Sequence, residues 1–582
     1  MSNRNFYLLL SLALAVYLFN LFIDVMQVDA AQYAVMSWEM LTTHSFLKLH
    51  CLGGDYLDKP PLIFWLSSLS FSVLGVNNFA YKLPSFLFAL LAIFSTHRFA
   101  RLYYDEKTSR MAAIMLATTQ AMFLLTNDVR TDTLLMGSVI FSIWQWAEFF
   151  EEGKIVNLLA GSLGVALALL AKGPIGLVAT GAAILPQLIL KGTWKKLFDL
   201  RLLVAVLIIA ITLAPMCVGL YQQFGLKGLK FYFWTQSFGR VTGESEWNNH
   251  PDLFFLLHTT VWAFLPWSLF LFLGWVGSII KLVNDKFKLA WTQEIISVSG
   301  FTLMFFMLSL SKYQLPHYIF VVYPLAAIMA ANGFLALSNW PKARPWLTAM
   351  QLAMLVGLPL VSILLQFALK GFDLISIACL VLLYPLAIWA AVKAEGGVKT
   401  FYTITRYLSY RFHRFYHYVF GGKSEAELTV AFALDVAYKK LFFASALVFI
   451  TFNFLLGAFY FPAILKYQPQ NDFGRYAKVH ECGSRFVCYN TIADFALCYY
   501  AQQRPETIWS KEAFKKKLTE KKELLVYASS SALRQLDEEH INYKTIEQRQ
   551  SYPVSKLTLK FLNPATRDSV CDKVYLLEVK LP

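Results

Sequence analysis

The sequence predicts a mainly α-helical, polytopic membrane protein that carries a small soluble domain at its C-terminal end. Of its 582 residues, 57% are hydrophobic and only 15% are charged, and the mean hydropathy is +0.49. Soluble domains carry about a quarter charged residues. A chain this apolar needs lipid around much of its surface. After residue 463 the composition becomes charged, which marks the start of a different domain.

About thirteen apolar segments approach the roughly 20 residues that a membrane-spanning helix needs. They cover residues 6–24, 82–100, 111–127, 132–150, 156–171, 174–190, 201–221, 254–280, 292–311, 317–336, 346–367, 373–392 and 442–462. These segments define a membrane domain over residues 1–463.

The formal net charge of +15 agrees with this topology. If the N-terminus lies in the cytoplasm, every cytoplasmic loop contains Lys or Arg, including the long basic segment 393–441. Because Lys and Arg in short loops orient membrane spans, the basic residues are explained without a nucleic-acid partner. We therefore expect membrane lipids, and no nucleic acid, around this chain.

The opposite side of the membrane then holds two large loops, at residues 25–81 and 222–253. Within the first, Leu62–Leu74 is apolar but too short to span, which favours an interfacial or re-entrant helix. The tail, residues 464–582, contains short alternating apolar runs typical of strands and is predicted to fold as a small α/β domain on this same side. The pairing of its cysteines is left open.

Charged and aromatic residues gather at the span ends on this non-cytoplasmic side. The set is Asp29, Tyr56, Asp58, Lys59, Arg130, Asp132, Lys172, Arg240 and Tyr318. Charges at a span end are costly, so they indicate function by default. Fixed cations suit a phosphate, and a carboxylate facing a hydroxyl can act as a general base. The pattern favours transfer of a group from a lipid phosphate to a hydroxyl.

Structural interpretations of the same residues stay open. Lys172 precedes Gly-Pro and is also typical of a lysine whose ammonium reaches the membrane surface from a helix end. Arg130 and Asp132 are spaced for a local ion pair or a helix cap. Lys59 comes before two prolines that favour the first turn of a helix.

Several short motifs, in order over roughly the first 340 residues, point to a known superfamily. They are Asp29-Ala30-Ala31-Gln32-Tyr33-Ala34, Tyr56-Leu57-Asp58-Lys59-Pro60-Pro61, Lys82-Leu83-Pro84-Ser85, Arg130-Thr131-Asp132, Ala171-Lys172-Gly173-Pro174 and Leu315-Pro316-His317-Tyr318. This ordered set resembles the GT-C glycosyltransferases that use polyprenyl-phosphate sugars. These include the bacterial lipid A aminoarabinose transferases and the protein O-mannosyltransferases.

The resemblance implies a role for each matching residue. Asp29 matches the catalytic base that activates the acceptor, and Asp58 matches an acidic position that can help to hold a divalent metal, the one cofactor that the resemblance suggests. Residues expected near the donor phosphate are Lys59, Lys172, Arg130 and Arg240. Residues expected to line the donor or acceptor pocket are Tyr56, Asp132 and Tyr318. The chain departs from the family pattern at Ala30, Gln32 and Ser237, which leaves the sugar and the metal open.

The implied function is an inverting glycosyltransferase of the bacterial inner membrane. It would move a sugar from a polyprenyl phosphate to a hydroxyl or phosphate acceptor at the periplasmic face, with lipid A or another glycolipid favoured. A protein Ser or Thr acceptor is the alternative within the same chemistry. A lipid-linked transporter or flippase and an O-antigen-type ligase are the alternatives outside it.

Overall fold

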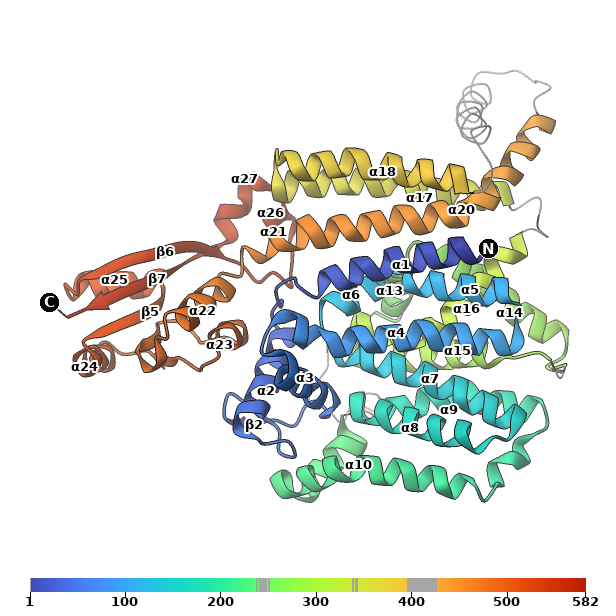
Figure 1. Cartoon of the computed structure of the whole chain (residues 1–582), viewed down its shortest axis with the longest axis horizontal. Coiled ribbons are helices and arrows are strands. Elements are labelled where there is room, and N and C mark those ends of the chain that lie inside the picture. Colours follow the sequence, from blue (N-terminus) through green and yellow to red (C-terminus); the bar gives the residue numbers. More distant parts are fainter. Residues whose placement is uncertain are drawn as a thin grey trace.

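Long helices, lying side by side, build most of the molecule (Figure 1). The structure is a computed structural model. It describes residues 2–236, 239, 249, 252–290, 292–337, 340, 344–394 and 427–581. All thirteen segments predicted to span the membrane are helical over most of their length. By length and composition, seven of the described helices are long and apolar enough to cross a membrane. The predicted number of about thirteen spans therefore stays a prediction.

The first half of the membrane domain supplies the helices that carry the candidate site. They are α1 (Asn3–Asn20), α4 (Asn78–Tyr103), α5 (Glu106–Ala117), α6 (Gln120–Asn127), α7 (Thr131–Glu152), α8 (Ile155–Lys172), α9 (Ile175–Leu190) and α10 (Leu202–Phe224). The segment predicted as one span, 111–127, lies in the two helices α5 and α6. The break has a local cause, because the Thr119 hydroxyl accepts a hydrogen bond from the Met122 N–H and so caps a new helix.

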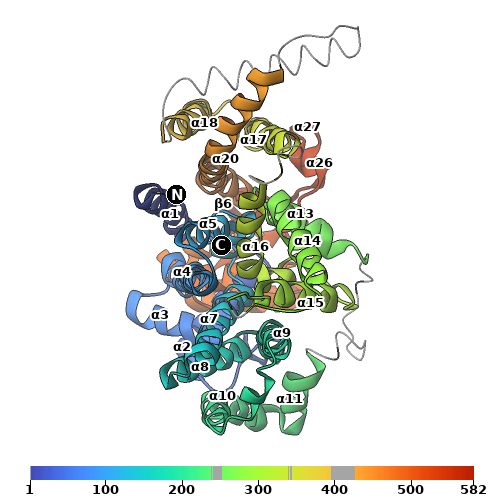
Figure 2. The ribbon, with the colours of Figure 1, turned by 90° about the vertical axis from the view of Figure 1, so that its right-hand side faces the viewer.

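The second half completes the bundle. Its helices are α11 (Leu226–Lys230), η2 (Phe231–Thr235), α13 (Phe255–Ala263), α14 (Ser268–Asn284), α15 (Ile296–Ser309), η3 (Pro316–Val322), α16 (Tyr323–Ala336), α17 (Arg344–Leu365), η5 (Gln366–Lys370), α18 (Leu374–Ala394), α20 (Glu427–Leu455), η6 (Leu456–Tyr460) and α21 (Phe461–Leu465). A short 3-10 helix, η1 (Trp194–Phe198), lies in the loop before α10. Seen along the bundle, α17, α18 and α20 form one flank and α8, α9 and α10 the other (Figure 2). Helix α20 begins inside the segment 393–441 that was assigned to a loop.

The first large loop, residues 25–81, is folded rather than extended. It contains α2 (Asp29–Thr43), a hairpin of β1 (His50–Cys51) and β2 (Gly54–Asp55), and α3 (Leu62–Leu74). The short apolar run predicted as a helix matches α3 residue for residue. Figure 1 places α2 and α3 at the same end of the bundle as the C-terminal domain, with the N-terminus at the other end. This arrangement agrees with the two sides that were assigned from the loop charges.

The tail contains a five-stranded mixed sheet in the order β4-β3-β5-β7-β6. Its strands are β3 (Phe486–Tyr489), β4 (Glu506–Ile508), β5 (Glu523–Ser529), β6 (Tyr543–Ser551) and β7 (Asp572–Lys580), with β3, β4 and β5 parallel and β5, β7 and β6 antiparallel. The surrounding helices are α22 (Gln470–Val479), η7 (Gly483–Arg485), α23 (Phe495–Ala501), α24 (Lys511–Lys521), α25 (Ser530–Glu538), α26 (Leu559–Leu562), α27 (Pro564–Arg567) and η8 (Asp568–Val570). The described residues include all seven cysteines, and each of them is a free thiol there.

Candidate active site

Asp29 is the first residue of α2, where the chain turns from α1 into the first large loop. Its side chain is 42% exposed, and its Oδ2 accepts a hydrogen bond of 2.6 Å from Nη1 of Arg130. A carboxylate at the first turn of a helix is also favoured by the free N–H groups there. Asp29 is therefore held in place while still reached by solvent, which suits a general base.

Arg130 joins Asp29 to a second carboxylate. It lies directly before α7, and its Nε donates to Oδ2 of Asp128 over 2.7 Å. Burial disfavours the Arg130 charge, but Asp128 and Asp29 outweigh it and raise the pKa of the guanidinium. Burial also raises the pKa of Asp128, and Arg130 opposes that shift. The guanidinium thus connects loop 25–81 to the start of α7.

A second ion pair lies at the ends of α7 and α8. Lys172, the last residue of α8, contacts Oδ1 of the buried Asp132 at 2.5 Å from its Nζ. The same ammonium lies over the Tyr318 ring, 4.1 Å from the ring centroid, a cation–π contact. His317 Nε2 lies 3.7 Å from the other Asp132 oxygen. Residues predicted from three separate motifs therefore form one cluster.

Lys59 and Asp58 form a third pair, with 2.8 Å between Nζ and Oδ2. The charges of Lys59, Lys172 and Arg130 all act on His317, so the three pairs belong to one site. The described residues contain no group of three or more His, Cys, Asp or Glu side chains placed to hold a metal ion. Asp58 pairs with the Lys59 ammonium group, and its part in holding a divalent metal stays a prediction.

Tyr33 is a member of this site that was not selected from the sequence. It lies one turn after Asp29 on α2, and its ring meets that of Phe64 at 5.7 Å, while Tyr56 meets the same Phe64 at 6.1 Å. Burial raises the pKa of the Tyr33 hydroxyl well above its usual value, and the neighbouring charges of Asp29 and Asp58 add to this effect. The spacing of four residues from Asp29 is the sequence signal that could have identified it.

Apart from Asp29, described above, the predicted site residues lie in one cluster, with the exception of Arg240, which the structure does not describe. Tyr56, Asp58, Lys59, Arg130, Asp132, Lys172 and Tyr318 all take part in the contacts above. Of the two structural interpretations left open for Arg130 and Asp132, the direct ion pair does not form, because each has a different partner, and Arg130 is the N-cap residue of α7 without a side-chain cap bond. Arg240 and Ser237 lie outside the described residues.

The C-terminal domain holds the segment that leads into Asp29. Gln468 accepts a hydrogen bond from the Gln27 N–H at 2.9 Å and donates to the Val25 carbonyl at 2.9 Å. The Val25 N–H in turn donates to the Tyr500 hydroxyl at 2.8 Å. Nearby, Arg475 forms an ion pair with Asp24. The backbone just before the catalytic candidate is therefore fixed by side chains from the far end of the sequence.

Comparison with known proteins gives related results at three levels. Residues 58–218 match the family model described as dolichyl-phosphate-mannose-protein mannosyltransferase. An undecaprenyl phosphate-α-4-amino-4-deoxy-L-arabinose arabinosyl transferase of Erwinia tasmaniensis is 26% identical over 334 residues, covering 54% of this chain and 57% of the relative. One of the same description from Edwardsiella ictaluri is 25% identical, covering 52% and 54%. The chain thus spans little more than half the length of these curated relatives.

The whole fold matches a solved structure. ArnT from Cupriavidus metallidurans, bound to undecaprenyl phosphate, superimposes with a TM-score of 0.66 at 16% identity, covering 99% of this chain and 98% of ArnT. Its apo form gives 0.63 at 15% identity, covering 98% and 97%. The chain therefore shares the fold of ArnT over nearly its whole length. In sequence it is similar to transferases named for undecaprenyl-phosphate sugars.

The contacts of Gln468 predict a measurable local effect. In Gln468→Ala the N–H of Gln27 and the carbonyl of Val25 both lose their partners. Because two hydrogen bonds of about 0.5–1.5 kcal/mol each are lost, amide hydrogen exchange over residues 25–32 should accelerate by about tenfold or more. Exchange mass spectrometry of the full chain measures this. Gln548→Ala is the control, because Gln548 is an exposed residue of β6. Unchanged exchange over 25–32 would show that other contacts hold this segment.

Proposed function

We propose that this chain is an inverting glycosyltransferase that moves a sugar from a polyprenyl phosphate to an acceptor at the periplasmic face of the bacterial inner membrane. The observation that carries the proposal is the placement of the Asp29 carboxylate beside Arg130, with the ammonium groups of Lys59 and Lys172 in the same site. A base and several fixed cations at one end of a helical bundle match a donor whose phosphate stays at the membrane surface.

Asp29 acts on the acceptor in this mechanism. Its carboxylate takes the proton of the acceptor hydroxyl, and the oxygen attacks the anomeric carbon from the side opposite the phosphate. The new C–O bond forms as the bond from the anomeric carbon to the phosphate oxygen breaks. The electron pair of that bond leaves with polyprenyl phosphate. Because the acceptor oxygen attacks from the opposite side, the configuration at the anomeric carbon inverts. Arg130, bound to one oxygen of Asp29, keeps the carboxylate oriented.

The lysines act on the leaving group. A phosphodiester donor carries one negative charge, and the released monoester carries roughly 1.5 to 2 at pH 7. Because this charge grows in the transition state, fixed cations lower the barrier more than they stabilise the bound donor. Lys59 and Lys172 supply these cations, and the Lys172 ammonium group makes a cation–π contact with the Tyr318 ring. No step passes through a metal ion.

The acceptor is proposed from similarity. The relatives named as arabinosyl transferases support the lipid-linked donor, and the resemblance of the ordered motifs to the lipid A aminoarabinose transferases favours lipid A or another glycolipid as the acceptor. The match to a protein mannosyltransferase family over 58–218 favours a Ser or Thr hydroxyl instead. Mass spectrometry of lipid A and of periplasmic peptides, from cells with and without this chain, separates the two. A sugar-sized mass lost from lipid A is the expected result, and the same loss from Ser or Thr peptides alone would make the acceptor a protein.

Asp29→Asn should abolish transfer while the chain still folds. The amide has the same shape but takes no proton, and loss of a general base costs about 10²- to 10⁴-fold in rate. Turnover of a radiolabelled polyprenyl-phosphate sugar by the purified chain measures this. Asp55→Asn in the same loop is the control, since Asp55 is 58% exposed and pairs with His50 rather than with Arg130. Full activity in Asp29→Asn would remove the proposed base.

Lys59→Ala should weaken donor binding and turnover together. One charge-assisted contact to phosphate contributes about 1.5–3 kcal/mol, so the apparent KM for the donor should rise by about tenfold or more. Steady-state kinetics at varied donor concentration measure the change. Lys48→Ala, an exposed lysine of the same loop, should have no such effect. An unchanged donor KM in Lys59→Ala would exclude this residue from the phosphate site.

A further inference from the structure

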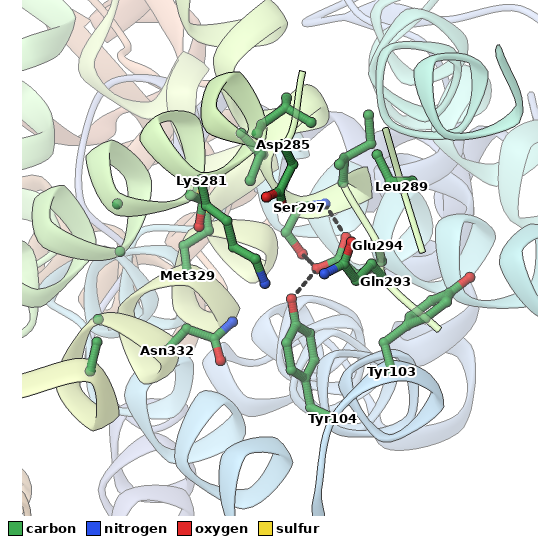
Figure 3. A pocket seen from close by; sticks show the side chains of 18 of the residues that line it. Tyr103, Tyr104, Lys281, Asp285, Leu289, Gln293, Glu294, Ser297, Met329 and Asn332 are labelled. Atoms are coloured by element: carbon green, nitrogen blue, oxygen red, sulfur yellow. Dashed lines mark hydrogen bonds between the residues drawn. The ribbon is translucent and has the colours of Figure 1, made fainter. Parts of the chain in front are cut away.

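A cavity lies at the other end of the bundle from Asp29. It has a volume of about 410 Å³ and opens between α14, α15 and α16, beside the end of α4 (Figure 3). Helix α4 begins at Asn78, which contacts Asp24 near the candidate active site, and ends at Tyr103, which lines the cavity. The cavity is therefore separated from the active site by the length of a helix, and no step of the proposed reaction uses it.

Four charged side chains line this cavity. Lys281 and Lys288 supply two positive charges, and Asp285 and Glu294 supply two negative charges. Figure 3 shows the Lys281 ammonium group extending into the space between Asn332 and Tyr104. Among the described residues, neither Lys281 nor Lys288 forms an ion pair. The cavity thus offers two ammonium groups that a ligand can contact.

Glu294 is a fixed part of the wall. Its Oε1 accepts hydrogen bonds from the Tyr104 hydroxyl at 2.6 Å and from the Ser297 hydroxyl at 2.8 Å, and its Oε2 accepts from the Ser297 N–H at 2.8 Å. These bonds tie the loop before α15 to the end of α4. A positive group entering the cavity therefore meets carboxylate oxygens on two sides, those of Glu294 and those of Asp285.

From this lining we propose that the cavity binds a zwitterionic phospholipid headgroup, in which a phosphate and a primary ammonium are joined by a short linker. The phosphate contacts Lys281 and Lys288, and the ammonium contacts Asp285 and faces Glu294. The formal charges of the two lysines and the two acidic residues sum to zero, so the cavity lining has no net charge that would select a simple anion or a simple cation. A ligand that carries both charges satisfies both sets of side chains at once.

The surroundings favour a lipid over a soluble molecule. The uncharged part of the wall combines polar side chains with apolar ones, among them Leu273, Val298 and Met329. On α14 itself, Val276, Ile280 and Val283 are 52%, 53% and 52% exposed, which is typical of a lipid-facing side. Lys281 lies in the last turn of α14, at the level where an apolar helix leaves the membrane. Pockets between membrane helices with basic residues at this depth are known binding places for lipid headgroups.

The test uses the full chain, purified in detergent and stripped of lipid. Native mass spectrometry then follows binding of phosphatidylethanolamine, phosphatidylcholine and phosphatidylglycerol, each added at the same concentration. Phosphatidylethanolamine should be retained best, because the trimethylated headgroup cannot donate hydrogen bonds and the glycerol headgroup has no cation. Lys281→Gln should reduce its retention by about tenfold, as expected for one charge-assisted contact. Lys195→Gln, an exposed lysine of η1 outside the cavity, is the matched control.

The outcomes separate the alternatives. Equal retention of the three lipids, or equal loss in Lys281→Gln and Lys195→Gln, would overturn the proposal. Displacement of bound lipid by millimolar soluble glycerophosphoethanolamine would support the headgroup chemistry but assign it to a soluble ligand. The thermal unfolding midpoint of Lys281→Gln should stay unchanged, because Lys281 is exposed. If that midpoint falls, Lys288→Gln takes its place, and no loss of retention in Lys288→Gln would overturn the proposal.

Discussion

The candidate active site depends on one guanidinium that binds two carboxylates from different parts of the chain. Arg130 donates to Asp29 at the start of α2 and to Asp128 just before α7. The planar fork of an arginine can hold two such partners in fixed directions, which a lysine cannot. Without this charge, Asp29 and the largely buried Asp128 would repel one another, at a cost of several kcal/mol. The position of the base and the closure of the first loop over the bundle therefore have the same cause.

The second support of Asp29 comes from the C-terminal domain. Gln468 and Tyr500 bind the backbone of residues 25–27, so the segment before α2 is held from the side opposite Arg130. A base must keep its distance to the acceptor within a fraction of an ångström to be effective. A loop that is fixed at both ends meets this requirement, which gives the soluble domain a structural part in the site even though none of its residues belongs to the charged cluster.

The sequence predicted the helical segments well because a long apolar run indicates by itself a helix that is surrounded by lipid or by other helices. The helix at Leu62–Leu74 followed from the same reasoning. It did not predict α2, since its residues alternate between polar and apolar without a long run, and its burial comes from contacts with the rest of the fold. Most of the candidate residues lie close together in the structure, and their roles stay predictions, whereas their direct partners could not be predicted from the sequence. Arg130 and Asp132 are two apart in sequence, and a local ion pair or a helix cap was one open interpretation of them, yet Asp132 contacts Lys172 at the end of another helix. Such pairings depend on tertiary distance, which spacing along the chain does not contain.

These pairings also bear on how a phosphate would bind and leave. Lys172 contacts the buried Asp132, and Lys59 contacts Asp58. An incoming donor phosphate must therefore share these ammonium groups with carboxylates that already hold them in place. The carboxylates weaken the binding of a singly charged donor. As negative charge grows on the departing phosphate, the lysine ammonium groups interact more strongly with the phosphate than with the carboxylates. They then favour release of the product, because each lysine has a partner to return to. A site of paired charges thus keeps the stabilisation for the transition state instead of for the bound lipid.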